Sequence, residues 1–175
     1  MTPIKVVVHG ASGKMGQEVL KTLCQENNFH PVGAVDIRAE NPAMALPDGS
    51  GSIPYSADLS SILSQTKPDV MVDFTVAKAS MPAVRIAAAH KVNLVIGTTG
   101  FSPEEISEIE QLAKTNDIGI ILAPNFALGA IIMVHLAQVG HDAGDDCAGL
   151  DLVAPAGRAR VGQGPGRVRL RGCAP

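Results

Sequence analysis

The feature that most constrains this chain is a glycine-rich turn directly after its first apolar run. Residues 4–8 are apolar apart from Lys5 and mostly β-branched, which is typical of a short buried strand. Glycines then follow at intervals of three, at Gly10, Gly13 and Gly16. A strand that ends in glycines and continues as a helix directs unpaired backbone N–H groups toward one point, where they can bind phosphate. The turn therefore predicts a dinucleotide-binding strand and helix.

Each glycine of this turn has its own expected role. Gly10 permits the tight turn, Gly13 lets the backbone approach a pyrophosphate, and Gly16 lets the helix pack closely on the strand. The spacing Gly-x-x-Gly-x-x-Gly differs from the more common Gly-x-Gly-x-x-Gly. The prediction consequently needs support from the rest of the chain.

The remaining sequence alternates between strand-like and helix-like segments. Short apolar runs predict strands at residues 4–8, 29–35, 70–74, 93–96 and 118–122. Apolar residues at helical spacing predict helices over residues 13–25, 77–89, 103–115 and 128–139, and a short helix between Leu59 and Pro68. Such alternation is typical of right-handed βαβ units, which form a parallel sheet covered by helices on both faces. We therefore predict an α/β fold with a Rossmann-like, doubly wound parallel sheet.

Two segments carry strong local signals. Residues 39–56 contain prolines and glycines among small polar residues, which predicts a surface loop. Farther along, Ser102 is followed by a proline and, three positions after itself, by Glu105, which is the pattern of a capped helix start. Phe101 and Ile106 are expected to pack together across this start as a hydrophobic staple.

Composition narrows the class of protein. Aromatic residues make up only 3% of the chain, so the core must be aliphatic, as in parallel strands buried on both faces. A formal charge of −3 gives no general attraction to nucleic acid or membranes. No apolar run is long enough to span a membrane, and no signal-peptide pattern precedes the first strand. We therefore expect a cytoplasmic protein with neither nucleic acid nor membrane as a partner.

The cysteines form no Cys-x-x-Cys pair, so no disulfide framework or metal site is predicted.

The ends of the predicted strands carry candidate cofactor-binding residues, because ligands of open parallel sheets bind beyond the carboxyl ends of the strands. Asp36 lies twenty positions after Gly16, where an acidic side chain can accept hydrogen bonds from an adenosine ribose. Arg38 can pair with a 2′-phosphate, and Lys14 lies within the turn. Because acidic and basic side chains are both present, we expect the site to bind NADH as well as NADPH. The alternative is that Asp36 is an ordinary turn residue and Arg38 a solvated loop charge.

Four short blocks lie at these strand ends. They are residues 6–16 with the glycine turn, Asp73-Phe74-Thr75, Gly97-Thr98-Thr99-Gly100 and Ala123-Pro124-Asn125-Phe126. In this order they resemble the 4-hydroxy-tetrahydrodipicolinate (dihydrodipicolinate) reductase family, over residues 4 to about 139. The resemblance implies that NADPH or NADH passes a hydride to a cyclic dicarboxylic acid in diaminopimelate and lysine biosynthesis. It also implies a homotetramer that assembles through a second domain.

The resemblance assigns the cofactor-binding residues block by block. The pyrophosphate is expected on Gly10, Ala11, Ser12, Gly13, Lys14, Met15 and Gly16. The adenosine ribose and any 2′-phosphate are expected on Asp36 and Arg38. The nicotinamide is expected between Gly97, Thr98, Thr99, Ala123, Pro124, Asn125 and Phe126, with Phe74 and Thr75 also at the cofactor. Threonine hydroxyls, backbone groups and the Asn125 amide have the chemistry to hold a carboxamide. No catalytic residue is assigned in this chain.

The chain departs from the family after residue 139. The family continues into a substrate domain with a His-His segment, a lysine and an Asp-Ala-Pro-Ser-Gly-Thr-Ala motif, none of which follows here. Five of the seven arginines lie between Arg158 and Arg171, and lysine is absent from this part. We therefore expect a dinucleotide-binding domain (1–139), a disordered Gly/Arg-rich tail (140–175) and no substrate domain. The abrupt change in composition suggests a frameshift or altered 3′ end as a hypothesis.

Three alternatives stay open. The tail could be a nucleic-acid-binding arm, although its five arginines exceed its four aspartates by one charge only and it has no aromatic side chains for stacking. The chain could be a stand-alone nucleotide-binding module. It could also be another Rossmann dehydrogenase, such as homoserine or aspartate-semialdehyde dehydrogenase, although no cysteine lies in a strand-end motif as the latter requires. Our expectation is a chain that binds the cofactor but is poorly active or inactive toward 4-hydroxy-tetrahydrodipicolinate.

Overall fold

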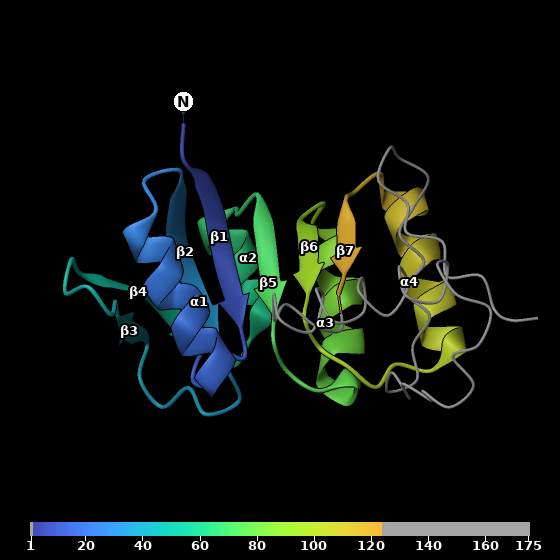
Figure 1. The fold of residues 1–175 in the computed structure, drawn as a ribbon, viewed down its shortest axis with the longest axis horizontal. Helices are drawn as coiled ribbons and strands as arrows, with labels where there is room; N and C mark the ends of the chain where they lie inside the picture. Colours follow the sequence, from blue (N-terminus) through green and yellow to red (C-terminus); the bar gives the residue numbers. More distant parts are fainter. Residues whose placement is uncertain (1, 124–175) are drawn as a thin grey trace, which may run out of the picture.

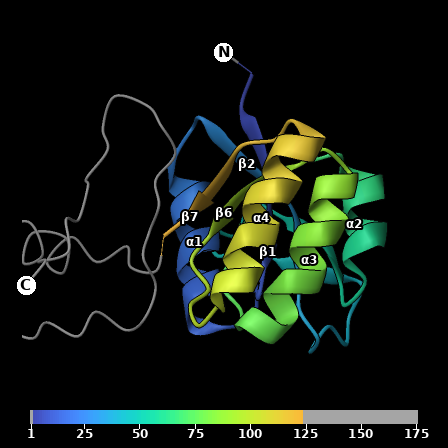
Figure 2. The same ribbon diagram turned by 90° about the vertical axis from the view of Figure 1, so that its right-hand side faces the viewer.

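The computed structural model describes residues 2–123, which form a seven-stranded sheet with helices on both faces (Figures 1 and 2). The strands are β1 (Ile4–His9), β2 (Phe29–Val35), β3 (Ala43–Ala45), β4 (Ser52–Ser56), β5 (Val70–Asp73), β6 (Asn93–Ile96) and β7 (Ile120–Leu122). The helices are α1 (Lys14–Gln25), α2 (Leu59–Thr66), α3 (Ala77–Ala89) and α4 (Pro103–Asn116). The predicted Rossmann-like α/β fold is confirmed.

The strand order identifies the edge at which a ligand would bind. The order is β3-β4-β2-β1-β5-β6-β7, and every neighbouring pair is parallel except β3 and β4. From β1 the chain first builds one side of the sheet, and it then returns to the other side of β1 with β5. The direction of winding therefore reverses between β1 and β5, and ligands of such sheets bind beyond the carboxyl ends of the strands at this point. In Figure 1 this edge is at the lower ends of β1 and β5.

A mostly aliphatic core fills both sides of the sheet. Val6 and Val8 of β1 pack with Leu20 and Leu23 of α1, whereas Val7 between them belongs to the cluster that α2, α3 and α4 cover. The two helical layers are separate in Figure 2, with α1 on one side of the sheet and the other three helices on the opposite side. A strand buried on both faces needs a continuous apolar run rather than an alternating one, which explains the three valines at the buried positions 6–8 of β1.

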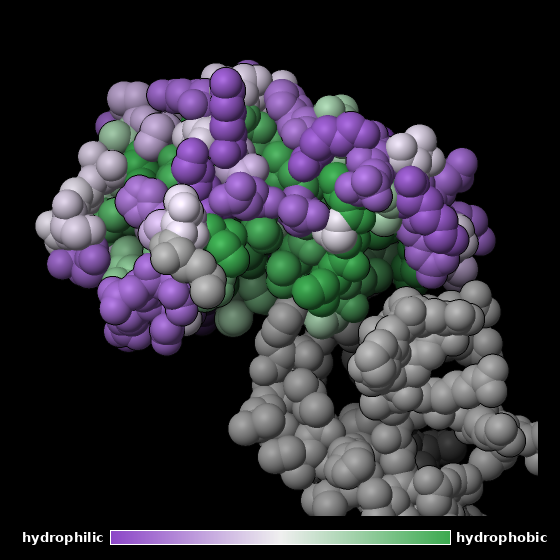
Figure 3. All heavy atoms as spheres, turned by 90° about the horizontal axis from the view of Figure 1, so that it is seen from above, coloured by the Kyte–Doolittle hydropathy of each residue, from purple (hydrophilic) through white to green (hydrophobic). Residues whose placement is uncertain are grey.

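The side of the sheet that carries α1 is only half covered by the described residues. α1 lies over β1 and β2, and no other helix of residues 2–123 lies on that side (Figure 2). Adjacent register positions of β5, β6 and β7 carry Val72, Val95 and Ile121, of which Ile121 is 58% exposed. Figure 3 shows hydrophobic side chains gathered along this part of the molecule.

The start of α4 matches its sequence signals. The Ser102 hydroxyl accepts a hydrogen bond from the Glu105 N–H (3.2 Å), and the Glu105 carboxylate accepts one from the Ser102 N–H (2.7 Å). Pro103 occupies the first helical position. Phe101 and Ile106 pack against the same core cluster on either side of the cap. The predicted capping box is therefore confirmed.

The prediction that residues 39–56 form only a surface loop is wrong. β3 and β4 form an antiparallel pair in this segment, and β4 extends the sheet beyond β2 by pairing Tyr55 with Ala34. Within β4, Ile53 and Tyr55 are buried and alternate with more exposed residues. This alternation is a strand signal, but the surrounding prolines and glycines obscured it. The sheet consequently has seven strands rather than five, and it is not entirely parallel.

The other elements lie close to their predicted positions. β5 ends at Asp73 instead of residue 74, and β7 begins at Ile120 instead of residue 118. The helix predicted over 128–139 and the tail 140–175 lie outside the residues that the structure describes. Within residues 2–123, no helix has the length and apolar character needed to cross a membrane. That same part of the chain contains no cluster of three or more His, Cys, Asp or Glu side chains suited to holding a metal ion.

Candidate functional site

The glycine turn connects β1 to α1. At two positions of the turn, Gly10 and Gly16, there is no room for a side chain. Gly10 has a φ of +80°, and a Cβ atom there would lie 2.6 Å from the Phe74 carbonyl oxygen. At Gly16, a Cβ atom would overlap the carbonyl oxygen of Gly10. The turn is held to the neighbouring strand by the Gly10 N–H, which donates to the Val35 carbonyl oxygen (2.8 Å). The backbone therefore takes the tight, closely packed course that the glycine spacing predicts.

The start of α1 faces the same edge of the sheet. Gly13 precedes the first helical residue, and it has no side chain to cap the first N–H groups of the helix. The Ser12 hydroxyl oxygen is buried and has no hydrogen-bond partner within residues 2–123. Unsatisfied donors at a helix start, with the positive end of the helix dipole behind them, suit a phosphate.

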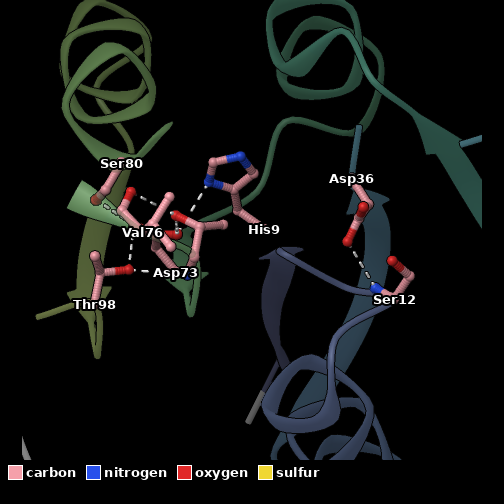
Figure 4. A network of polar contacts seen from close by, with 8 residues as sticks. His9, Ser12, Asp36, Asp73, Val76, Ser80 and Thr98 are labelled. Atoms are coloured by element: carbon pink, nitrogen blue, oxygen red, sulfur yellow. Dashed lines mark hydrogen bonds and ion pairs between the residues drawn. The ribbon is translucent and has the colours of Figure 1, made fainter. Parts of the chain in front are cut away.

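Asp36 joins the end of β2 to this turn. Its two carboxylate oxygens accept hydrogen bonds from the Ser12 N–H and the Arg38 N–H, each at 3.0 Å. Figure 4 shows the carboxylate directed at Ser12. Burial raises the pKa of Asp36, but the donors of Ser12 and Arg38 lower it further than burial raises it, so the net pKa is below the ordinary value. The carboxylate is therefore ionised at neutral pH, and its remaining lone pairs can accept hydrogen bonds from a ligand.

The Arg38 guanidinium lies at the outside of this corner. Its Nε atom is 3.9 Å from an Asp36 carboxylate oxygen, and its side chain is 73% exposed. An exposed arginine at this distance is a weak partner for Asp36, because solvent screens the interaction. It is free to turn toward an anionic group placed next to the carboxylate.

A second polar group surrounds Asp73 at the end of β5, on the other side of β1 (Figure 4). Asp73 is fully buried. One of its oxygens accepts from the Thr75 hydroxyl (2.8 Å) and lies 3.0 Å from Nδ1 of His9. The other accepts from the hydroxyls of Ser80 and Thr98, the latter at 3.3 Å. One carboxylate thus gathers side chains from the ends of β1, β5 and β6 and from α3.

The surroundings of Asp73 keep this carboxylate charged. Burial raises its pKa, but the contact with His9 and the hydrogen bonds from Ser80 and Thr75 lower it below the ordinary value. His9, at the end of β1, faces this carboxylate from the neighbouring strand. The sequence reasoning did not single out Ser80, because a serine inside an apolar helix has no local pattern that reveals its partner.

The two threonines after β6 face different surroundings. The Thr98 hydroxyl accepts a hydrogen bond from the Thr75 N–H (2.9 Å) and donates to Asp73, and Thr98 is 2% exposed. Thr99 is exposed. Gly97 packs against the ring of Phe74, which a Cβ atom at that position would overlap. The hydroxyl of Thr98 is therefore committed to the protein interior, and only Thr99 has a hydroxyl at the surface.

These contacts bring most of the predicted site residues to one rim. The glycine turn contacts Asp36 on one side and the residues after β5 on the other, and the latter are bonded to Thr98. Ala123 lies beside the end of β6, because its N–H donates to the Ile96 carbonyl oxygen (3.0 Å). The exposed side chains of Lys14 and Met15 lie in the first turn of α1. Pro124, Asn125 and Phe126 lie outside the described residues.

Two apolar side chains on this rim were not predicted as site residues. Ile37, directly after Asp36, is 88% exposed, and Val76, directly after Thr75, is 65% exposed. Apolar side chains so exposed contribute little to the core. Their signal in the sequence is a large apolar residue immediately after a polar strand-end residue, which is weak without a structure.

Comparison with known proteins agrees with this arrangement. Residues 4–126 match the family model described as dihydrodipicolinate reductase, N-terminus. A 4-hydroxy-tetrahydrodipicolinate reductase of Dehalococcoides mccartyi is 99% identical over 139 residues, which are 79% of this chain and 53% of that protein. The enzyme of the same name from Listeria innocua is 40% identical over 137 residues, covering 77% of this chain and 52% of that protein. The chain thus spans about half the length of these relatives.

Solved structures give the same result at the level of the fold. A dipicolinate-bound dihydrodipicolinate reductase from Paenisporosarcina sp. TG-14 superposes with a TM-score of 0.69 and 26% identity, covering 96% of this chain and 72% of the other. A homoserine dehydrogenase of S. aureus has a TM-score of 0.55 at 14% identity, covering 68% of this chain and 32% of the other, which is a likeness of fold alone. With the family match spanning most of the described residues, this chain belongs to the dihydrodipicolinate reductase family, of which it carries the N-terminal domain.

Proposed function

We propose that this chain binds NADPH or NADH as the cofactor domain of a 4-hydroxy-tetrahydrodipicolinate reductase. The observation that carries the proposal is the contact between Asp36 and the glycine turn, in which an ionised carboxylate and a helix start lie side by side. A dinucleotide carries a ribose next to a pyrophosphate, so one molecule can meet both groups. The names of the 99% and 40% identical relatives supply the reaction.

The turn fits a pyrophosphate by its shape and by its donors. Side chains are excluded at Gly10 and Gly16, so the backbone is open to close approach. The buried Ser12 hydroxyl has no partner within residues 2–123, and it gains one if a phosphate oxygen binds at the start of α1. Lys14, exposed in the first helical turn, adds a positive charge at this position.

The adenosine end of the site is proposed at Asp36 and Arg38. Asp36 accepts hydrogen bonds from the ribose hydroxyls with the lone pairs that are not used by the N–H groups of Ser12 and Arg38. Arg38 can move from its loose contact with Asp36 to a 2′-phosphate, which makes NADPH acceptable in addition to NADH.

The nicotinamide end is proposed on the β5 and β6 side, at Phe74, Thr75, Gly97, Thr98 and Thr99, and also at 123–126. When bound, the reduced nicotinamide supplies a hydride, and the protein's part is to orient it and to exclude competing reactions. Phe74, which packs on Gly97, provides an apolar wall. The exposed Thr99 hydroxyl and the backbone groups of this loop provide hydrogen bonds for a carboxamide.

The reaction proposed for the family member as a whole is hydride transfer to 4-hydroxy-tetrahydrodipicolinate, a cyclic dicarboxylate, in lysine and diaminopimelate biosynthesis. We place it in the cytoplasm, and the enzyme is proposed to act as a homotetramer. This chain covers 53% of the length of its 99% identical relative. The family's His-His segment, lysine and Asp-Ala-Pro-Ser-Gly-Thr-Ala motif are not among residues 1–175, and we propose that these residues by themselves bind the cofactor with little or no turnover.

Two measurements test this function on the full chain. Calorimetric titration is expected to give micromolar dissociation constants for NADPH or NADH, within the usual range of about 1 µM to 1 mM for such ligands. If neither NADPH nor NADH gives a binding signal, the proposal is wrong. A coupled assay with the cyclic substrate is expected to show little activity, and turnover near the typical ~10 s⁻¹ would contradict the proposed inactivity.

A further inference from the structure

We propose that Asp73 is a positioning residue for the nicotinamide half of the site and that it acts through Thr98. The inference rests on the proposed cofactor binding and deepens it, since it assigns a task to a buried carboxylate that is not among the proposed cofactor contacts. The carboxylate orients the Thr98 hydroxyl, and the hydroxyl holds the Thr75 N–H. The loops after β5 and β6 are thereby fixed relative to each other.

The orientation of the Thr98 hydroxyl follows from the number of its protons. An ionised carboxylate only accepts hydrogen bonds, so the single hydroxyl proton of Thr98 must point at Asp73, 3.3 Å away. A lone pair of the hydroxyl oxygen then faces the Thr75 N–H at 2.9 Å. Without the carboxylate, the hydroxyl would be free to rotate and to turn its proton toward that N–H, which would break the contact.

This bridge lies where regular strand pairing stops. The last backbone hydrogen bond between β5 and β6 runs from the Gly97 N–H to the Asp73 carbonyl oxygen (2.9 Å). One residue farther on, the connection between the two loops is made by the side chain of Thr98. Phe74 and Thr99, next to the bridged residues, are both candidate nicotinamide contacts. Their placement depends on how firmly the two loops are joined.

The remaining donors around Asp73 make it a firm anchor. Ser80 of α3 donates to the same carboxylate oxygen as Thr98, and the Thr75 hydroxyl donates to the other oxygen at 2.8 Å. His9 lies beside that second oxygen. A fully buried carboxylate is costly unless such donors surround it, and an apolar side chain would fill the same space at lower cost. Stability alone therefore does not require a charge at this position, whereas the orientation of the Thr98 hydroxyl does.

The two halves of the site can be tested separately because they lie on opposite sides of β1. Asp36 and Ser12 form one group and Asp73, Ser80, Thr98 and His9 the other, without a shared residue (Figure 4). ADP-ribose carries the adenosine and the pyrophosphate but lacks the nicotinamide. Loss of the Asp73 bridge should consequently weaken NADH binding and spare ADP-ribose binding.

The experiment is calorimetric titration of the full chain with NADH and with ADP-ribose. Asp73→Ala and Thr98→Val are expected to weaken NADH binding about tenfold, the effect of one lost hydrogen bond, and to leave the affinity for ADP-ribose within about twofold. Thr98→Ser keeps the hydroxyl and is expected to restore NADH affinity. The control is Asp69→Asn, an exposed aspartate at the other end of β5, which should leave both affinities unchanged.

A second readout separates positioning from mere folding. On the wild-type chain, NADH with its nicotinamide held in the site is expected to show enhanced fluorescence, and NADH bound through its adenosine end alone should lose that enhancement. Unchanged NADH affinity and fluorescence in Thr98→Val would overturn the inference, as would an equal loss of NADH and ADP-ribose binding. If Asp73→Ala does not fold, the pair Thr98→Val and Thr98→Ser decides. A wild-type chain that binds neither ligand rejects the proposed cofactor function and this inference with it.

Discussion

The carboxylate of Asp36 accepts a hydrogen bond of 3.0 Å from the backbone N–H of Ser12, twenty-four residues away in the sequence. This contact ties the end of β2 to the turn after β1. It means that one acidic side chain holds the turn in place and keeps lone pairs for a ligand, which we propose to be a ribose. The predictions below concern the choice between NADPH and NADH, the tight packing of the turn, and the charges of the groups around it.

Replacing Arg38 by alanine should separate the two cofactors. The side chain is 73% exposed and makes only a loose contact with Asp36, so the fold should not depend on it. Loss of a charged hydrogen bond to a 2′-phosphate, worth about 1.5–3 kcal/mol, should weaken NADPH binding by at least about tenfold while NADH binding stays unchanged. Titration with both cofactors measures this. Arg85→Ala, which removes an exposed arginine paired with Glu108, is the matched control; equal losses for NADPH and NADH in Arg38→Ala would speak against a 2′-phosphate site.

Gly16→Ala should destabilise the fold because no space exists for a methyl group. The added Cβ would overlap the carbonyl oxygen of Gly10, so the backbone must move. This typically lowers the free energy of unfolding by about 1–3 kcal/mol or more. Gly49→Ala is the control, because Gly49 has a φ of +74° but no atom within 4 Å of its added Cβ. Its expected cost is about 1 kcal/mol from backbone strain alone. Urea denaturation compares the two, and a smaller loss in Gly16→Ala than in Gly49→Ala would contradict the tight packing.

The stability of the fold should depend on the charge of Asp73 in acid. The pKa of this carboxyl is lower in the folded protein than the ordinary value of 3.8. The folded state therefore holds the charge to lower pH than the unfolded chain does. Its contribution is fully present above about pH 4 to 5, and it is lost as the pH falls through the folded pKa.

The comparison that tests this is urea denaturation of wild type and Asp73→Asn at pH 7 and pH 3. At pH 7 the variant should be less stable by about 1–3 kcal/mol, because an amide cannot accept all the hydrogen bonds that the carboxylate accepts. At pH 3 the difference between the two proteins should be smaller. A difference that grows toward low pH would mean that the folded state favours the protonated carboxyl.

Local sequence signals predicted the elements whose causes are themselves local. The glycine turn, the capping box of Ser102 and Glu105, and the strand β2 follow from neighbouring residues, and the structure has them where the sequence indicates. β3 and β4 were missed because proline and glycine signals in 39–56 outweighed the alternation of Ile53 and Tyr55. The strand depends on pairing with β2, which no short segment shows.

The polar group around Asp73 depends on contacts between distant residues. Thr98 is 25 residues from Asp73, and Ser80 belongs to a helix whose pattern shows only its apolar face. The sequence therefore identified the strand ends that meet at the rim. It did not show that Thr98 turns its hydroxyl inward while Thr99 stays exposed.

The most direct test of the central claim, that the start of α1 binds the pyrophosphate, is a charge placed at Gly13. Its φ of −75° and ψ of 164° suit any residue, and aspartate is favourable at this capping position, so Gly13→Asp should not lower the free energy of unfolding by more than about 1 kcal/mol. Its negative charge would repel a phosphate. Gly13→Ala, whose Cβ has the same 3.2 Å contact with the Gly10 carbonyl oxygen, is the uncharged control.

Calorimetric titration of wild type, Gly13→Ala and Gly13→Asp with NADPH and NADH gives the answer. Gly13→Asp is expected to bind both cofactors at least about a hundredfold more weakly than Gly13→Ala does, because a like charge at close range costs several kcal/mol. Equal binding by Gly13→Asp and Gly13→Ala would contradict a pyrophosphate site at this turn.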